Sequence, residues 1–155
     1  MRKRGIGLLF LARRHIHMSE LTKDDIDIVK ATISSCSEQI DHGVRRIYGA
    51  EVDDISADEV NCASAVMVNK LDDIINTSDD DVLVGVAKEL REQIGSTPTG
   101  AGLDIVKAGI LITRHSVQSL SMEDSTDKLC QEIHTTFNKV RAELAEEEAI
   151  AKEFS

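Results

Sequence analysis

Residues 103–120 have the sequence LDIVKAGILITRHSVQSL, and the apolar run at 105–112 is interrupted by a single charged residue, Lys107. Spacings of three and four, typical of one face of an α-helix, connect Val106, Ile110, Thr113, Val117 and Leu120. Because this stretch is apolar around most of the helix circumference, we expect it to form the most buried helix of the fold.

Two segments before this stretch carry apolar residues at the same helical spacing. The first begins near Thr22, where Asp25 completes a capping-box pattern, and it stops at Gly49. The second begins at Ser56, which precedes Glu59 by three positions, and it continues to about residue 76. Each segment therefore predicts an amphipathic helix with a defined start.

Two more helices complete the pattern. Ser78 and the aspartates at 79–81 provide a cap and negative charge for a helix that ends at Gly95. After a Gly-rich linker at 95–102, which includes the only proline, comes the helix at 103–120. Ser121 with Asp124 then begins the last helix, whose apolar pattern thins after residue 144 into a charged end.

These segments predict an all-α fold, an antiparallel bundle of about five amphipathic helices. The chain has 155 residues, one proline and 3% aromatic residues, a composition that argues against an all-β domain. We expect residues 19–155 to form a single domain. The first and last helices are longer than the middle ones, so their ends are expected to extend past the core and to be able to pair with another copy.

The charge distribution narrows the class of partner. The chain has 18 basic and 28 acidic residues, and from Met18 onward the net charge is −15. A body of this charge repels phosphate backbones, which argues against nucleic acid as a partner. It favours either simple solubility or docking on the basic surface of another protein.

Residues 1–18 differ from the rest of the chain. They contain no acid, and an apolar run at 5–12 lies between two basic clusters. Eight residues are too few for a membrane span, and no cleavage site for a secretory signal follows, so we predict a basic extension outside the fold. It is either an upstream extension before a true start at Met18 or, in a eukaryote, an organelle transit peptide.

The three cysteines are an odd number without paired spacing, which is typical of a reduced compartment. We therefore expect a cytoplasmic protein, or one of an organelle matrix if the basic extension is a transit peptide.

Metal chemistry has weak support in the sequence, and no cofactor is expected. All-α magnesium-dependent nucleotide hydrolases place Glu-Glu-x-x-Glu before Glu-x-x-Asp, an order that is absent here, so this class is a second alternative. Cys130 and His134 lie one helical turn apart, as do Glu38 and His42, which is a possible spacing for a metal site. Cys130, however, falls on an apolar face, where a thiol is usually a core residue.

A first alternative function comes from the residues 114–121, RHSVQSLS. This stretch resembles the motif of histidine phosphotransfer modules, which are small helical bundles with an exposed histidine in the middle of a helix. The resemblance implies His115 as the phosphorylated residue. Gln118 stands where those modules have a lysine, whose charge would stabilise the phosphoryl group.

The function that we favour is an adaptor, inhibitor or chaperone-like subunit that binds another protein or self-assembles and has no catalysis of its own. The evidence is the acidic bundle, the absence of an assembled catalytic motif and the long terminal helices. Apolar residues left outside the core would form the contact with the partner. The candidates in the fourth and last helices are Leu111, Val117, Leu120, Leu144 and Ile150.

Overall fold

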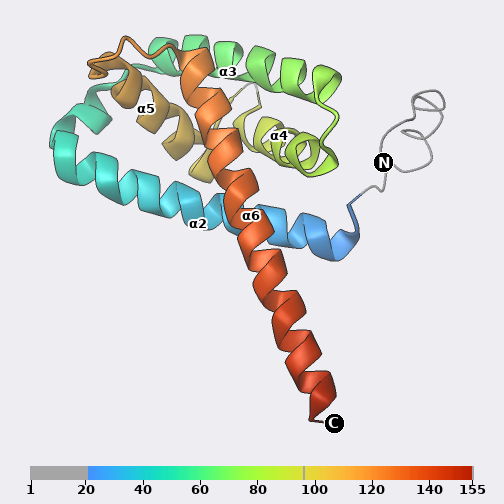
Figure 1. Cartoon of the computed structure of the whole chain (residues 1–155). Helices are drawn as coiled ribbons and strands as arrows, with labels where there is room; N and C mark the ends of the chain where they lie inside the picture. The colour runs from blue at the N-terminus through green and yellow to red at the C-terminus, as the bar shows by residue number, and fades with distance from the viewer. Residues whose placement is uncertain (1–20, 96, 155) are drawn as a thin grey trace.

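The computed structural model describes residues 21–95 and 97–154, and every regular element in these ranges is a helix (Figure 1). The elements are α2 (Lys23–Tyr48), the 3-10 helix η1 (Gly49–Asp54), α3 (Ala57–Thr77), α4 (Asp81–Ile94), α5 (Gly100–Arg114) and α6 (Met122–Glu153). The predicted all-α fold of about five helices is confirmed. None of these helices is long and apolar enough to cross a lipid bilayer. The basic extension at 1–18 lies outside the described residues.

The helices form a stack that α6 crosses. α2 and α3 run in opposite directions on two sides of the molecule, with α4 and α5 between them (Figure 1). The most extensive packing joins α3 to α4 and α2 to α5, whereas α2 and α3 make no direct contact. The middle layer therefore holds the two outer helices together.

The predicted helix starts are largely confirmed by the caps. Thr22 and Asp25 form a reciprocal capping box at the start of α2, and Ser121 and Asp124 form another at the start of α6. At α4, the cap is Asp80 instead of Ser78: its carboxylate accepts hydrogen bonds from the backbone of residues 82 and 83. Ser78 belongs to the end of α3, where its own N–H donates to the last turn.

α5 is the most buried helix, as predicted. Seven of its 15 residues are buried, and it contacts every other element of the described chain. Leu111 has no exposed surface, because it points into this core. Its assignment to a binding surface was therefore wrong: in a helix that is apolar on most sides, the sequence pattern does not show which positions remain outside.

α5 ends at Arg114, six residues before the predicted end. The hydroxyl of Ser116 accepts hydrogen bonds from the backbone N–H groups of Gln118 and Leu120, and Ser119 has a positive φ of 56°. These bonds replace helical ones, a competition for which serine is well suited. Val117 consequently lies in a turn and is 97% exposed instead of continuing the apolar face of the helix.

Residues 49–55 form an element that the periodicity did not predict. Gly49 ends α2 with a positive φ of 55°, and η1 then buries Val52 while Ile55 follows it into the core. The segment is too short to show a helical period of its own.

Gly102 permits the closest backbone approach in the molecule's middle layer. A Cβ atom at this position would lie 2.1 Å from the carbonyl oxygen of Gln93, near the end of α4. Gly43, in the interior of α2, has no atom within 4 Å of an added Cβ. The two helical glycines therefore respond to the same substitution in opposite ways.

We predict that Gly102→Ala destabilises the protein by at least about 1–3 kcal/mol, because backbone must move to accommodate the methyl group. Gly43→Ala is expected to stabilise it by about 0.5–1 kcal/mol through helix propensity. Urea unfolding followed by circular dichroism measures both. Equal stability of the two variants would contradict the close approach of α4 and α5.

Candidate protein-interaction surface

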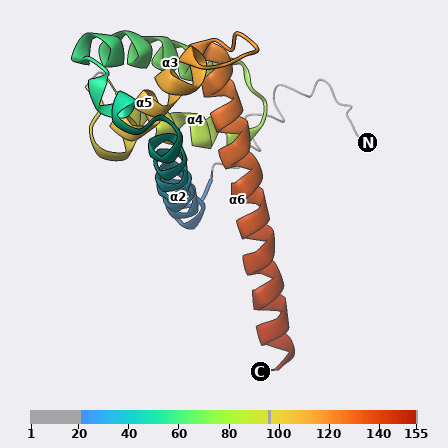
Figure 2. The same cartoon turned by 90° about the vertical axis from the view of Figure 1, so that its left-hand side faces the viewer.

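The C-terminal part of α6 projects away from the bundle. Phe137 is the last fully buried residue of α6, and every described residue from Arg141 onward is exposed. Both views show this part of the helix continuing past α2 (Figures 1 and 2). We call residues 141–154 the arm. Its 13 helical residues span about 20 Å, at 1.5 Å per residue.

The sequence of the arm explains why it is helical without packing. Residues 141–153 consist almost entirely of Ala, Glu, Leu, Lys and Arg, which favour helices. The buried part of α6 supplies the helix nucleus, so the arm only has to propagate. Packing therefore contributes little here, and the apolar side chains of the arm remain exposed.

Three apolar side chains stand on the arm. The exposed fraction is 42% for Leu144, 50% for Ile150 and 84% for Phe154. At 3.6 residues per turn, these three positions fall within about one third of the helix circumference. Five glutamates accompany them, against one lysine and one arginine. The arm therefore presents an apolar stripe in acidic surroundings.

The base of the arm is attached to the start of α2. In the guanidinium of Arg141, Nη2 lies 3.5 Å from a carboxylate oxygen of Asp25, and Cζ lies 5.8 Å from the centroid of the Phe137 ring. Asp25 is only 7% exposed, and its carboxylate also accepts the backbone N–H of Thr22 in the capping box. One carboxylate thus belongs to the capping box of α2 and also contacts the base of the arm.

A groove lies between the start of α2 and the base of the arm. It is lined on the α2 side by Thr22, Asp24, Asp25, Asp27 and Ile28, and on the α6 side by Arg141, Leu144, Ala145 and Glu148. We call it the α2/α6 groove. Among the described lining residues, the single cation already pairs with Asp25, so the remaining carboxylates make this part of the groove acidic. Sequence analysis missed it, since its walls come from opposite ends of the domain.

The predicted surface residues are only partly brought together. Leu144 and Ile150 both lie on the arm. Val117 and Leu120 belong to the turn before α6, where Leu120 is half-buried. Leu144 and Ile150 are thus the predicted surface residues that share one stripe, which also includes Phe154.

His115 does not have the setting of a phosphotransfer histidine. It stands at the end of α5 instead of mid-helix, and its ring stacks on Tyr48 with centroids 4.4 Å apart. Its Nε2 lies 2.8 Å from a carboxylate oxygen of Glu51, which would repel an incoming phosphoryl group. Gln118 lies in the following turn.

The same cluster ties η1 to α5. The carboxylate of Glu51 is hydrogen-bonded to Nε2 of His115 and, at 3.0 Å, to Nη1 of Arg114. Nη2 of Arg114 also donates to Glu59 at the start of α3. Hydrogen bonding from His115, followed by that from Arg114, lowers the pKa of Glu51. The cluster is therefore a surface clamp that uses His115 as a structural residue.

Because the pKa of Glu51 is lowered, the stabilisation of the fold by this clamp depends on pH. It is fully present above the pKa of a glutamate in the unfolded chain, about 4.3, and is lost as the pH falls through the lower pKa of Glu51 in the folded protein. We predict that Glu51→Gln lowers the melting temperature at pH 7 and that its difference from the parent protein shrinks toward pH 3. Asp54→Asn, in the same element, is the control and is expected to show no such convergence. A constant Glu51→Gln difference over this range would refute the clamp.

Neither predicted metal pair is assembled. Cys130 has no exposed surface, while Nε2 of His134 faces the Asp80 carboxylate at 2.8 Å. Burial raises the pKa of the Cys130 thiol to about 12, which opposes the thiolate that metals bind. Glu38 and His42 are both exposed. Within residues 21–95 and 97–154, no group of three or more His, Cys, Asp or Glu side chains is arranged to hold an ion.

The burial of the cysteines predicts their reactivity. We expect Cys62, which is exposed, to react with a small alkylating reagent at neutral pH, whereas Cys130 reacts only after unfolding. Mass spectrometry of native and urea-unfolded protein measures the labelling at each site. Comparable native labelling of Cys62 and Cys130 would contradict this core packing.

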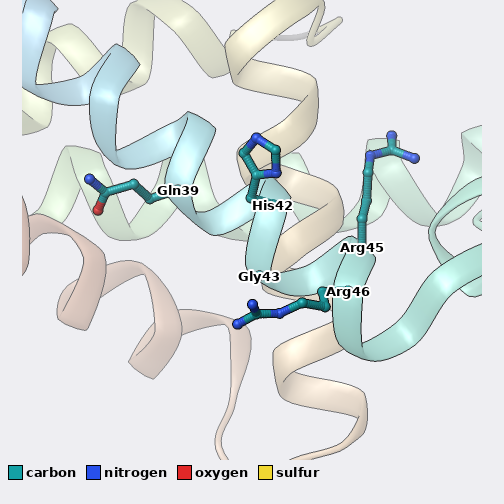
Figure 3. Close-up of a pocket in the computed structure, with 5 residues that line it drawn as sticks. All are labelled: Gln39, His42, Gly43, Arg45 and Arg46. Atoms are coloured by element: carbon teal, nitrogen blue, oxygen red, sulfur yellow. The ribbon is translucent and has the colours of Figure 1, made fainter.

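An open pocket on α2 includes two arginines among its lining residues. It is lined by Gln39, His42, Gly43, Arg45 and Arg46 (Figure 3). Arg45 is already held by Asp41 at 3.0 Å and by Asp53 at 3.5 Å. The side chains of Arg45 and Arg46 extend in different directions in Figure 3, so they do not converge on one anion.

Comparison of the chain with protein-family models, with curated proteins and with solved structures finds no match. The arm and the α2/α6 groove are accordingly the features on which a functional proposal rests.

Proposed function

We propose that this is an interaction protein, without catalysis of its own, that binds another protein through the arm. The observation that carries the proposal is the exposed stripe of Leu144, Ile150 and Phe154 on a helix that projects from the body. A helix of this kind fits the helix-in-groove mode of recognition, in which apolar anchors at helical spacing enter a partner's groove.

The charge of the arm defines the chemistry of the partner. Residues 141–154 carry five acidic and two basic side chains, and the body from Met18 onward carries a net charge of −15. The complementary surface is an apolar groove with a basic rim. Long-range attraction between these charges would accelerate association and would weaken as salt is added.

Attachment of the arm at its base supports this function. The Arg141–Asp25 contact and the buried Phe137 hold the emerging helix in one direction relative to the body. A docking helix that is ordered before binding loses less conformational entropy on association. The body therefore acts as a rigid support for the arm.

The test compares two double variants that remove the same kind of surface. Ile150→Ser/Phe154→Ser removes two anchors of the arm, whereas Ile47→Ser/Val117→Ser removes two apolar side chains that are 71% and 97% exposed on the body. Partners co-purified from the protein's own cells are identified, purified and titrated. We expect the arm variant to bind at least roughly tenfold more weakly, a loss typical of removing anchor residues, and the body variant to bind normally.

Hydrogen exchange gives a second measurement on the same complex. Amides at 141–153 should gain protection when the basic partner is added, because the exposed helix becomes covered. Equal binding of the two double variants would overturn the proposal. The proposal would also be overturned if the isolated complex were a homo-oligomer that the arm variant abolishes, because the partner would then be a second copy of the chain.

A further inference from the structure

The α2/α6 groove combines acidic and apolar side chains next to the base of the arm. Asp24, Asp27 and Glu148 contribute carboxylates, and Ile28 and Leu144 contribute apolar surface. Arg141 is the only cation among the lining residues that the structure describes, and Asp25 lies 3.5 Å from it. The groove thus complements a segment that is both basic and apolar.

The chain itself contains such a segment directly before α2. Residues 1–17 include Arg2, Lys3, Arg4, Arg13 and Arg14, no acid, and an apolar run at 5–12. The side chain of Leu21 lies over Gly85 of α4, since a Cβ at Gly85 would be 2.3 Å from it. The next residue, Thr22, already lines the groove. The basic segment therefore joins the body at the edge of the groove.

We propose that residues 2–14 dock, within the same molecule, in the α2/α6 groove and along the arm. The cations pair with the carboxylates of Asp24, Asp27 and Glu148, and the apolar run covers Ile28 and Leu144. This inference rests on the proposed function: the segment has the same chemistry as the basic partner and competes with it for the arm.

The lengths are compatible with docking inside one molecule. The arm is about 20 Å long, and a 13-residue segment spans about 20 Å as a helix or up to about 43 Å when extended. Six residues, 15–20, connect the segment to α2. A short tether of this kind gives a local concentration in the millimolar range, so weak contacts suffice for substantial docking.

A charge-swap experiment in the full chain tests the docking. Asp27→Lys/Glu148→Lys reverses two charges of the groove, and Arg4→Glu/Arg13→Glu/Arg14→Glu reverses three charges of the segment. Each set alone should accelerate hydrogen exchange at 141–153, by roughly tenfold if the intrinsic affinity is about 0.1 mM at millimolar effective concentration. Combining both sets should restore protection.

The matched control is Glu38→Lys/Glu132→Lys. It makes the same charge change at exposed positions of α2 and α6 that do not line the groove. We expect it to leave exchange at 141–153 unchanged. An effect equal to that of the groove variant would overturn the proposal, because only the overall charge would then matter.

Protein concentration separates docking within one molecule from pairing of two copies. Protection at 141–153 should be the same in dilute and concentrated samples. Protection that appears only at high concentration, together with a dimer in sedimentation, would overturn the proposal in favour of exchange between copies. Absence of rescue in the combined charge swap would overturn it as well.

Failure of the docking is distinguishable from failure of the proposed function. If the arm binds a basic partner but charge reversal leaves exchange unchanged, the docking is refuted and the function stands. If the charge swap restores protection but the Ile150→Ser/Phe154→Ser variant keeps full partner affinity, the docking stands and the function is refuted. If the docking and the proposed function are both correct, reversing the charges of residues 4, 13 and 14 strengthens binding of the partner, because the competing segment no longer docks.

Discussion

Burial of α5 is the constraint on which the rest of the structure depends. This helix contacts α2, α3, α4, α6 and η1, and Val106 and Leu111 at its centre have no exposed surface. Apolar surface of this extent is stable in water only when it is covered on most sides. The other helices therefore surround α5, and α2 and α3 are kept apart on its two sides.

The core ends partway along α6. Thr126, Cys130, Ile133 and Phe137 are buried in the body, whereas every described residue from Arg141 onward is exposed, and the start of α2 lies beside the base of the arm across the α2/α6 groove. α6 has 32 residues, about 48 Å, which exceeds the width of the stack that it crosses. The excess length becomes the arm, and the Asp25–Arg141 contact lies at its base.

Charged side chains at the surface have two roles. In the clamp, the carboxylate of Glu51 joins η1 to Arg114 and His115 at the end of α5. His115, which the resemblance in the sequence had indicated as a phosphorylated residue, therefore has a structural contact here. The carboxylates of the α2/α6 groove, by contrast, gather without enough cations to balance them. Charges of the first kind stabilise the fold, whereas charges of the second kind are suited to binding a basic segment.

Local patterns in the sequence determined the five α-helices and the starts of α2, α3 and α6. The capping boxes at Thr22 and Ser121 and the apolar spacing of three and four are properties of neighbouring residues, so they were visible without the fold. The exposed tail with Leu144 and Ile150 was likewise indicated by the thinning of the pattern. Only the tertiary structure decided that α5 stops at Arg114, that Leu111 is inside, that His115 stacks on Tyr48, and that Asp25 meets Arg141. The last two are contacts between residues distant in the sequence. The burial of Leu111 and the end of α5 depend on packing and turn geometry that helical periodicity does not specify.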